Sequence, residues 1–283
     1  MAYPICGLFT EERLEKDGRS GLFKPSILQV PGLKAGFVVR FLQMGITAAF
    51  LYILPLLLQL SFNFTAMQTG VALMPFSLSL LIFALLGARL SARFFANRII
   101  QAGFIMAVAG LGSLGISIQP GAGFADLVLG ALFGAGVGLI VSQILNLILS
   151  AVAEKDTAET AGLTSTFEQL GNAIGVALVG TVMLASLATV MQQKINDSTV
   201  LPEEAKSAMM TAVEDGIQLM SNDRLTSGLE ATGADPAMIA EVETLYGQSR
   251  TEAFRAGVAL LVFAGLAGLV ASLWLPKRKL VKA

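Results

Sequence analysis

Six long apolar runs, separated by shorter polar stretches, set the pattern of this chain. Each run holds about 20 or more residues, the length that an α-helix needs to cross a hydrocarbon core about 30 Å thick. The pattern therefore predicts an all-α membrane protein with six transmembrane helices. The predicted spans are residues 36–60, 69–90, 99–118, 124–150, 164–191 and 253–275.

The long polar segment between the fifth and sixth spans carries helix signals of its own. After Pro202, apolar residues recur every four positions, as in an amphipathic helix. Asp235 followed by Pro236 is typical of an N-cap and a first helical residue. We therefore expect two amphipathic helices here, forming a small cap on the membrane or on the sixth helix rather than a separate functional domain. The chain thus divides into residues 1–35, 36–191 (five spans), 192–252 (loop), 253–276 (sixth span) and 277–283 (basic tail).

The basic residues predict the orientation of the spans, because lysine and arginine are retained on the cytoplasmic side. If the spans alternate in direction, fourteen of the nineteen basic residues fall on one side. Both termini are therefore expected in the cytoplasm, and the 192–252 loop is expected outside. The fourteen are Arg13, Lys16, Arg19, Lys24, Lys34, Arg40, Arg89, Arg93, Arg98, Lys155, Lys277, Arg278, Lys279 and Lys282.

Composition excludes several classes of function. Hydrophobic residues make up 54% of the chain, charged residues 14%, and the mean hydropathy is +0.72, as in an integral membrane protein. One cysteine, Cys6, and no histidine argue against a disulfide framework, a metal site or a cofactor. The sequence has no H-E-x-x-H or G-x-S-x-G motif, so no enzyme is predicted. The scattered basic residues argue against a nucleic-acid partner.

Small and polar residues recur at helical spacing in the fourth and fifth spans. In the fourth span they occur every four residues, at Gly130, Gly134, Gly138, Ser142 and Asn146, with Gln143 beside Ser142. In the fifth span one face carries Ser165, Glu168, Asn172 and Gly175, and Gly171 completes a GxxxG motif. Glycine stripes predict close helix packing. Combined with amide and carboxylate groups, they are equally compatible with a water-lined path.

Two runs in the chain resemble a known transporter family. FNFTAMQTGVALMPFSLSLLIFALLGARLSARFFANRII, with a T-G-x-x-x-x-P helix at Thr69, resembles the start of the second half of major facilitator superfamily transporters, particularly the 14-helix drug:proton antiporter branch. AETAGLTSTFEQLGNAIGVALVGTVM resembles the A-G-x-x-S/T…Q-L-G-x-x-x-G-x-A segment of that branch. EERLEKDGRSGLFKPSIL is similar to the loop that precedes this half.

The chain also departs from the family pattern. Its cytoplasmic basic loop carries Arg89, Arg93 and Arg98. Ala92, however, stands where the family's G-x-L-a-D-R-x-G-x-R pattern has an acid, and Phe95 stands where it has a glycine. The salt bridge that this pattern forms is therefore not expected here. Glu168 lies where the branch often has a basic residue, so no family role is transferred to it.

The resemblance implies one half of a major facilitator fold. It also implies a function: the C-terminal half of a proton-coupled multidrug efflux transporter in a bacterial inner membrane, exporting amphipathic small molecules. Because transporters of this type bind substrate between two halves, we expect this half to be inactive without an N-terminal half. An extracytoplasmic adaptor is a further candidate partner. The alternative is a non-transporting membrane scaffold that binds a partner through its outer segment.

Polar residues in the fourth and fifth spans are the candidates for the substrate and proton pathway. They are Gln143, Asn146, Glu168 and Asn172. Glu168 has two interpretations. If the fifth helix starts near Thr164, the carboxylate lies about 6 Å inside its end and acts as a favourable charge at the helix N-terminus. Alternatively, it faces the cavity and exchanges protons or attracts cationic substrates.

Overall fold

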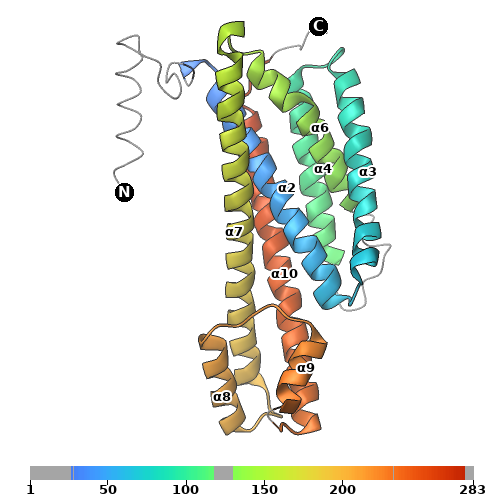
Figure 1. Cartoon of the computed structure of the whole chain (residues 1–283), viewed down its shortest axis with the longest axis vertical. Coiled ribbons are helices and arrows are strands. Elements are labelled where there is room, and N and C mark those ends of the chain that lie inside the picture. The colour runs from blue at the N-terminus through green and yellow to red at the C-terminus, as the bar shows by residue number, and fades with distance from the viewer. Residues whose placement is uncertain (1–26, 28, 118–129, 232, 278–283) are drawn as a thin grey trace.

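The structure, a computed structural model, describes residues 27, 29–117, 130–231 and 233–277. In this part of the chain six helices are long and apolar enough to cross a membrane, and no strand occurs, which confirms the predicted all-α fold with six spans. The helices are α2 (Leu33–Ser61), α3 (Ala66–Leu90), α4 (Ala96–Ser117), α6 (Gly130–Leu149), α7 (Thr157–Asp197) and α10 (Pro236–Ser272) (Figure 1). Most of the predicted 1–35 segment, the start of the fourth span and the tail beyond Lys277 lie outside the described residues.

Local sequence signals explain where two helices begin. At the start of α3, the Thr65 side chain accepts a hydrogen bond from the Gln68 backbone N–H at 3.3 Å. Gln68 Oε1 accepts one in return from the Thr65 N–H at 2.8 Å, which completes a capping box. At the start of α10, Asp235 Oδ1 accepts from the Ala237 N–H at 3.5 Å, with Pro236 at the first helical position.

Helix α6 packs between α3 and α4, and its glycines allow the backbones to approach closely. A Cβ atom on Gly134 would collide with the carbonyl oxygen of Phe76 in α3, and one on Gly138 would collide with that of Leu80. Gly136 meets the backbone of α4 in the same way. These positions need glycine because no side chain fits, and the close approach maximises van der Waals contact between helices.

Helices α2 and α7 cross at a second set of glycines. A Cβ atom on Gly171 would collide with the Phe41 carbonyl oxygen, and one on Gly175 would collide with that of Gly45. Gly45 has the same constraint, since its Cβ would lie 3.0 Å from the Gly171 carbonyl oxygen. The GxxxG motif therefore lies at the closest approach of the two helices. The position of this crossing fixes how far α7 is shifted along α2. It therefore determines which α2 side chain lies opposite Glu168.

Three aromatic rings fill the space where α2, α3 and α6 meet. The centroid of Phe50 lies 5.0 Å from that of Phe76 and 4.4 Å from that of Phe133, and Phe76 and Phe133 stack at 5.7 Å. All three side chains are buried. Gly130 lies beside this cluster, where a Cβ atom would be 3.8 Å from the Phe50 ring. Gly130 therefore belongs to the packed region without marking a close backbone approach.

Helices α7 and α10 extend well beyond the other four (Figure 1). At 1.5 Å per residue their lengths are about 60 and 55 Å, roughly twice the thickness of the hydrocarbon core. The boundaries predicted at residues 192 and 252 therefore fall inside continuous helices. The apolar run predicts only the part of a helix that lipid covers. Helical structure continues into the polar part, where no proline interrupts either helix after Pro236.

Two short helices connect the projecting ends of α7 and α10. Helix α8 (Glu203–Glu214) begins where the Pro202 signal predicted a helix. The signal at Asp235 and Pro236 was interpreted wrongly as a separate amphipathic helix, because it opens α10 itself. Helix α9 (Asn222–Ala231) was not predicted, since it is short and its apolar face consists of only Leu225 and Leu229.

These four segments enclose a small second core at the end of the bundle opposite the α3–α4 turn (Figure 1). We call this region the cap. Its buried residues are Leu187, Met191, Ile195, Leu201, Val213, Val242, Leu245, Tyr246 and Ala253. The expected cap on the sixth helix therefore exists as a packed unit of α8, α9 and the two long helices.

Buried polar contacts fix the segment before α9 to α10. Arg250 Nη1 donates a hydrogen bond to the Met220 carbonyl oxygen at 2.8 Å, and Nη2 donates to Asn222 Oδ1 at 3.0 Å. The Tyr246 hydroxyl donates to the Gln218 carbonyl oxygen at 2.7 Å and accepts from the Met220 N–H at 2.8 Å. These bonds satisfy backbone groups of a segment that has no regular structure of its own.

Candidate substrate and proton pathway

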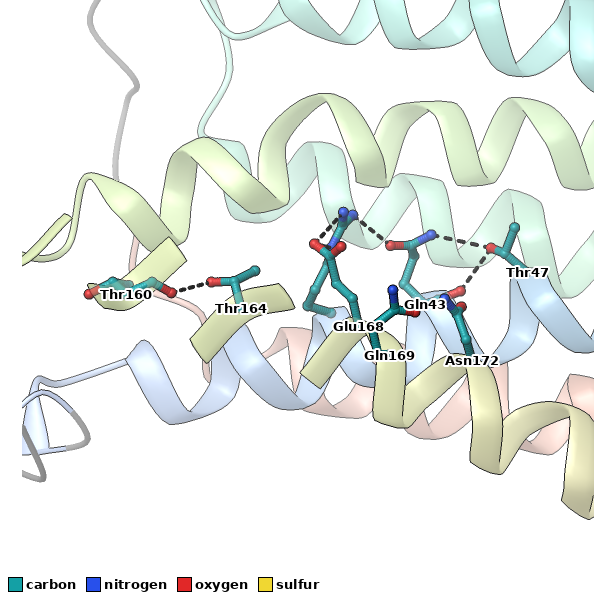
Figure 2. Close-up of polar contacts among 8 residues, drawn as sticks. Gln43, Thr47, Thr160, Thr164, Glu168, Gln169 and Asn172 are labelled. Atoms are coloured by element: carbon teal, nitrogen blue, oxygen red, sulfur yellow. Dashed lines mark hydrogen bonds and ion pairs between the residues drawn. The ribbon is translucent and has the colours of Figure 1, made fainter. Parts of the chain in front are cut away.

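Glu168 of α7 forms an ion pair with Arg40 of α2 across the α2–α7 crossing. Figure 2 labels Glu168 and marks its polar contacts by dashed lines. Its Oε1 atom accepts a hydrogen bond from Arg40 Nε at 2.7 Å and lies 2.6 Å from Arg40 Nη2. The Glu168 side chain is 22% exposed and the Arg40 side chain is 11% exposed. Charges with so little exposure are screened weakly by salt and are strongly coupled to each other.

The polar contacts continue along α2 from Arg40. Arg40 Nη1 donates to Gln43 Oε1 at 2.9 Å, and Gln43 Nε2 donates to Thr47 Oγ1 at 3.2 Å. The Thr47 hydroxyl in turn donates to the Gln43 carbonyl oxygen at 2.8 Å. These residues follow one another at helical spacing on one side of α2, so the chain of hydrogen bonds runs about 10 Å deeper into the span.

The depth of Glu168 excludes its interpretation as a charge at the helix end. Helix α7 begins at Thr157, seven residues before the predicted start at Thr164. Glu168 therefore lies about 16 Å from the start of the helix, three turns inside it. The helix dipole acts on charges within the first turn only. The residues before Thr164 continue the helix although they are too polar to be counted as part of an apolar span.

Asn172 lies one turn beyond Glu168 on α7, as Figure 2 shows. Its Nδ2 atom donates to Gln169 Oε1 at 3.1 Å, and its side chain is partly exposed. The predicted alignment of Glu168 and Asn172 on one part of the helix is thus present in the structure. Ser165, predicted on the same face, is exposed.

Gln143 and Asn146 lie away from the ion pair, on α6. Gln143 is 1% exposed, and its Nε2 atom donates to the Gly87 carbonyl oxygen of α3 at 2.8 Å and to Ser142 Oγ at 3.0 Å. Its Oε1 atom is buried and has no hydrogen-bond partner among the described residues. Asn146 is exposed. The structure therefore brings Glu168 together with α2 side chains and places Gln143 between α6 and α3.

Arg40 and Gln43 were not predicted as site residues. The sequence nevertheless contains a signal for the ion pair. Arg40 and Glu168 are each four residues after the start of their predicted spans, residues 36–60 and 164–191, which run in the same direction. Opposite charges at equal depth in parallel spans can meet if the two helices are neighbours. The sequence did not show that α2 and α7 are neighbours.

The basic loop that the sequence predicts on the cytoplasmic side lies between α3 and α4. Arg89 is in the last turn of α3, Arg93 is in the connecting turn and Arg98 is in the first turn of α4. All three are exposed, and none of the ion pairs between described residues involves them.

An open apolar groove runs beside the α2–α7 crossing. It holds about 80 Å³ and is lined by Phe41, Gly45, Gly171, Ile174, Leu260 and their neighbours. Sites for drug-sized ligands commonly hold about 300–1,000 Å³, so this groove encloses only part of such a molecule. Among the described residues no group of three histidine, cysteine, aspartate or glutamate side chains is placed to hold a metal ion.

Six helices able to span a membrane, tight glycine crossings and a largely buried ion pair between two of them are features of an integral membrane protein. Comparison with known proteins identifies the family. Residues 8–176, more than half of the chain, match the Major Facilitator Superfamily. The chain belongs to this superfamily, which confirms the resemblance drawn from its motifs.

Several curated relatives are exporters or resistance proteins. The chain is 24% identical over 223 residues to the "Probable actinorhodin transporter" of Streptomyces coelicolor, which covers 77% of this chain and 38% of that protein. It is 30% identical over 130 residues to the "Multidrug resistance protein Stp" of Mycobacterium tuberculosis, covering 46% and 24%. It is 30% identical over 156 residues to the "Puromycin resistance protein pur8" of Streptomyces alboniger, covering 53% and 31%. The chain thus spans well under half the length of these relatives.

Proposed function

We propose that this chain forms one half of a proton-coupled exporter of amphipathic small molecules. Its membership of the superfamily carries the proposal, because such transporters bind substrate between two halves and move them alternately. The names of the relatives, which are exporters and resistance proteins, support the substrate class. The small open groove beside α2 and α7 supports the need for a second half, which supplies the opposite wall.

Glu168 is the group that we assign to proton exchange or to the attraction of cationic substrates. An ionisable residue inside a span is costly and is retained mainly where it serves a pathway or a specific pair. In this proposal, protonation of Glu168 breaks its ion pair with Arg40, and the released guanidinium keeps its bond to Gln43. Asn172 lines the same path, and exposed Asn146 faces the second half. Gln143 is buried between α6 and α3, so we do not assign it to the path.

The proposal includes an orientation and a location. The chain lies in a bacterial inner membrane with both termini in the cytoplasm, which follows from the fourteen-to-five distribution of basic residues. The cap then lies outside. Its exposed helices α8 and α9 present a surface on which an extracytoplasmic adaptor docks.

A reconstitution experiment tests the need for a second half. Vesicles containing this chain alone should show no efflux of an ethidium-like dye on imposing a proton gradient. Vesicles that also contain the matching N-terminal half should export the dye. Proton-driven efflux by the chain alone would refute the proposed half, and crosslinking of the same vesicles would then show whether two copies assemble.

A substitution tests the role of Glu168 in the reconstituted two-half transporter. Glu168→Gln removes the charge but keeps the size, so transport should lose its dependence on pH or lose cationic substrates selectively over neutral ones. Glu252→Gln, which removes a half-exposed carboxylate near the cap, is the matched control and should leave both unchanged. An unchanged pH profile for both substrate classes in Glu168→Gln would leave the ion pair with a structural role only.

A further inference from the structure

Three arginines lie in or next to the α3–α4 turn, and no ion pair to an acid of the described residues involves them. Arg89, Arg93 and Arg98 fall within ten residues and are all exposed. The position where an acid is expected in the family pattern is Ala92, so the local sequence supplies no carboxylate either. A cluster of like charges is self-repelling, and it attracts an external anion when one fits between its members.

An apolar pocket lies at the α3–α4 turn, and one of these arginines, Arg98, lines it. It holds about 230 Å³ and is lined by Leu90, Phe94, Ile99, Ala102 and Leu139, with Arg98 at its edge. Phe94 is 50% exposed although it is a large apolar side chain. The pocket thus joins an apolar wall to a guanidinium, and two more arginines flank its residues in sequence.

The position of the pocket indicates the environment from which a ligand comes. Leu90 is the last residue of α3 and Ile99 lies in the first turn of α4, so the pocket is at the end of two membrane spans. The polar headgroups of the bilayer lie at this level, with the acyl chains directly below. An occupant therefore has an anionic group at the level of the arginines and an apolar part beside Phe94.

We propose that the α3–α4 turn is a binding site for an anionic phospholipid. Its phosphate is held by Arg93 and Arg98, with Arg89 contributing to the positive field, and part of an acyl chain lies against Leu90, Phe94 and Leu139. A zwitterionic lipid carries its own cation and complements the three guanidinium groups less well. Free phosphate has no apolar part that could contact the apolar wall of the pocket. This site is separate from the Arg40–Glu168 pair and does not depend on transport.

The single tryptophan of the chain makes a direct test practical, because it is removed by one substitution, Trp274→Phe. In that background Phe94→Trp places the only tryptophan in the pocket. The chain is reconstituted in vesicles of phosphatidylcholine or phosphatidylglycerol with brominated acyl chains, which quench tryptophan on contact. Quenching should indicate a preference for the anionic lipid of about fivefold, the factor expected for one arginine at an anionic surface.

Two variants and a control separate this site from ordinary lipid contact. Arg93→Gln with Arg98→Gln should reduce the preference to near one. Ala102→Leu should also reduce it, because it fills the pocket and keeps every charge; Ala102 is exposed, so the larger side chain does not overpack the core. The control is Phe263→Trp on the exposed face of α10, which should show no preference.

The outcomes that overturn the proposal are specific. Equal quenching of the Phe94→Trp protein by both lipids would indicate only general solvation by the bilayer. A preference that survives both the arginine substitutions and Ala102→Leu would exclude this site as its cause. A preference abolished by added inorganic phosphate would assign the arginines to a free anion instead of a lipid.

Discussion

Neutralising one member of the Arg40–Glu168 pair should destabilise the protein much more than neutralising both. Glu168→Met leaves the Arg40 guanidinium 11% exposed, with the Gln43 side chain as its remaining hydrogen-bond partner among those described above. Arg40→Met leaves the Glu168 carboxylate 22% exposed and without the donor that it contacts at 2.6 and 2.7 Å. Breaking a buried pair in this way costs about 3–5 kcal/mol, and the partial exposure here places each single variant near 3 kcal/mol.

The double variant separates the ion pair from the general loss of contacts. Arg40→Met with Glu168→Met places two apolar side chains of similar length at the crossing, and such replacements are often neutral, so we expect a stability within about 1 kcal/mol of the parent chain. The interaction energy from the cycle should therefore be about 5–7 kcal/mol. This is larger than the roughly 0.6 kcal/mol typical of neutral hydrogen bonds between membrane helices.

The assay is reversible unfolding by sodium dodecyl sulfate in mild detergent micelles, followed by helical circular dichroism. Glu252→Gln serves as the control, because its i,i+3 pair with Arg255 is 37–48% exposed and exposed pairs contribute at most about 1 kcal/mol. Additive losses in the double variant, with an interaction energy near zero, would refute the view that the two charges stabilise each other at the α2–α7 crossing.

Three further predictions follow from the packing. Gly175→Val should destabilise by about 1–3 kcal/mol in the same assay, because its side chain collides with the α2 backbone, whereas Gly180→Val should cost less since its nearest neighbour lies 3.9 Å away. Arg250→Met should speed proteolysis of the segment before α9 several-fold without unfolding the spans, because two hydrogen bonds that hold that segment are lost. In intact cells and a cysteine-free background, an impermeant maleimide should label Thr199→Cys and not Ala92→Cys, and the reverse pattern would invert the proposed orientation.

Hydrophobic pattern alone determined the number and approximate position of the spans. A stretch of about 20 apolar residues has few alternatives to a helix in lipid, because every backbone N–H and C=O group must find a partner within the segment. The helix starts at Pro202 and at Asp235 could also be read locally, since a cap depends on residues within one turn. Motif order was sufficient to recognise the superfamily.

The ends of the long helices depended on more than hydropathy. Helix α7 starts seven residues earlier and ends six residues later than its predicted apolar window, and α10 begins at Pro236 instead of Ala253. Hydropathy indicates only the part of a helix that lies in the lipid, not the full length of the helix. The polar extensions of α7 and α10 are stabilised by contact with α8, α9 and each other in the cap, and no local pattern reports such contacts.

Only the tertiary structure decided which polar residues meet. Glu168 and Asn172 could be placed on one part of α7 from spacing, but the partner of Glu168 lies 128 positions away, on a helix whose neighbours the sequence does not specify. Contact between α2 and α7 arises from the collision-free fit of Gly45, Gly171 and Gly175, which requires both backbones in place. Gln143 shares a helix face with residues predicted to line a path. Helix α3 packs against that face, however, and the Gly87 carbonyl oxygen of α3 accepts a hydrogen bond from the Gln143 side-chain amide. Helical spacing determines the direction in which a side chain points from its own helix axis. The packing of the neighbouring helices determines which residues the side chain contacts in that direction.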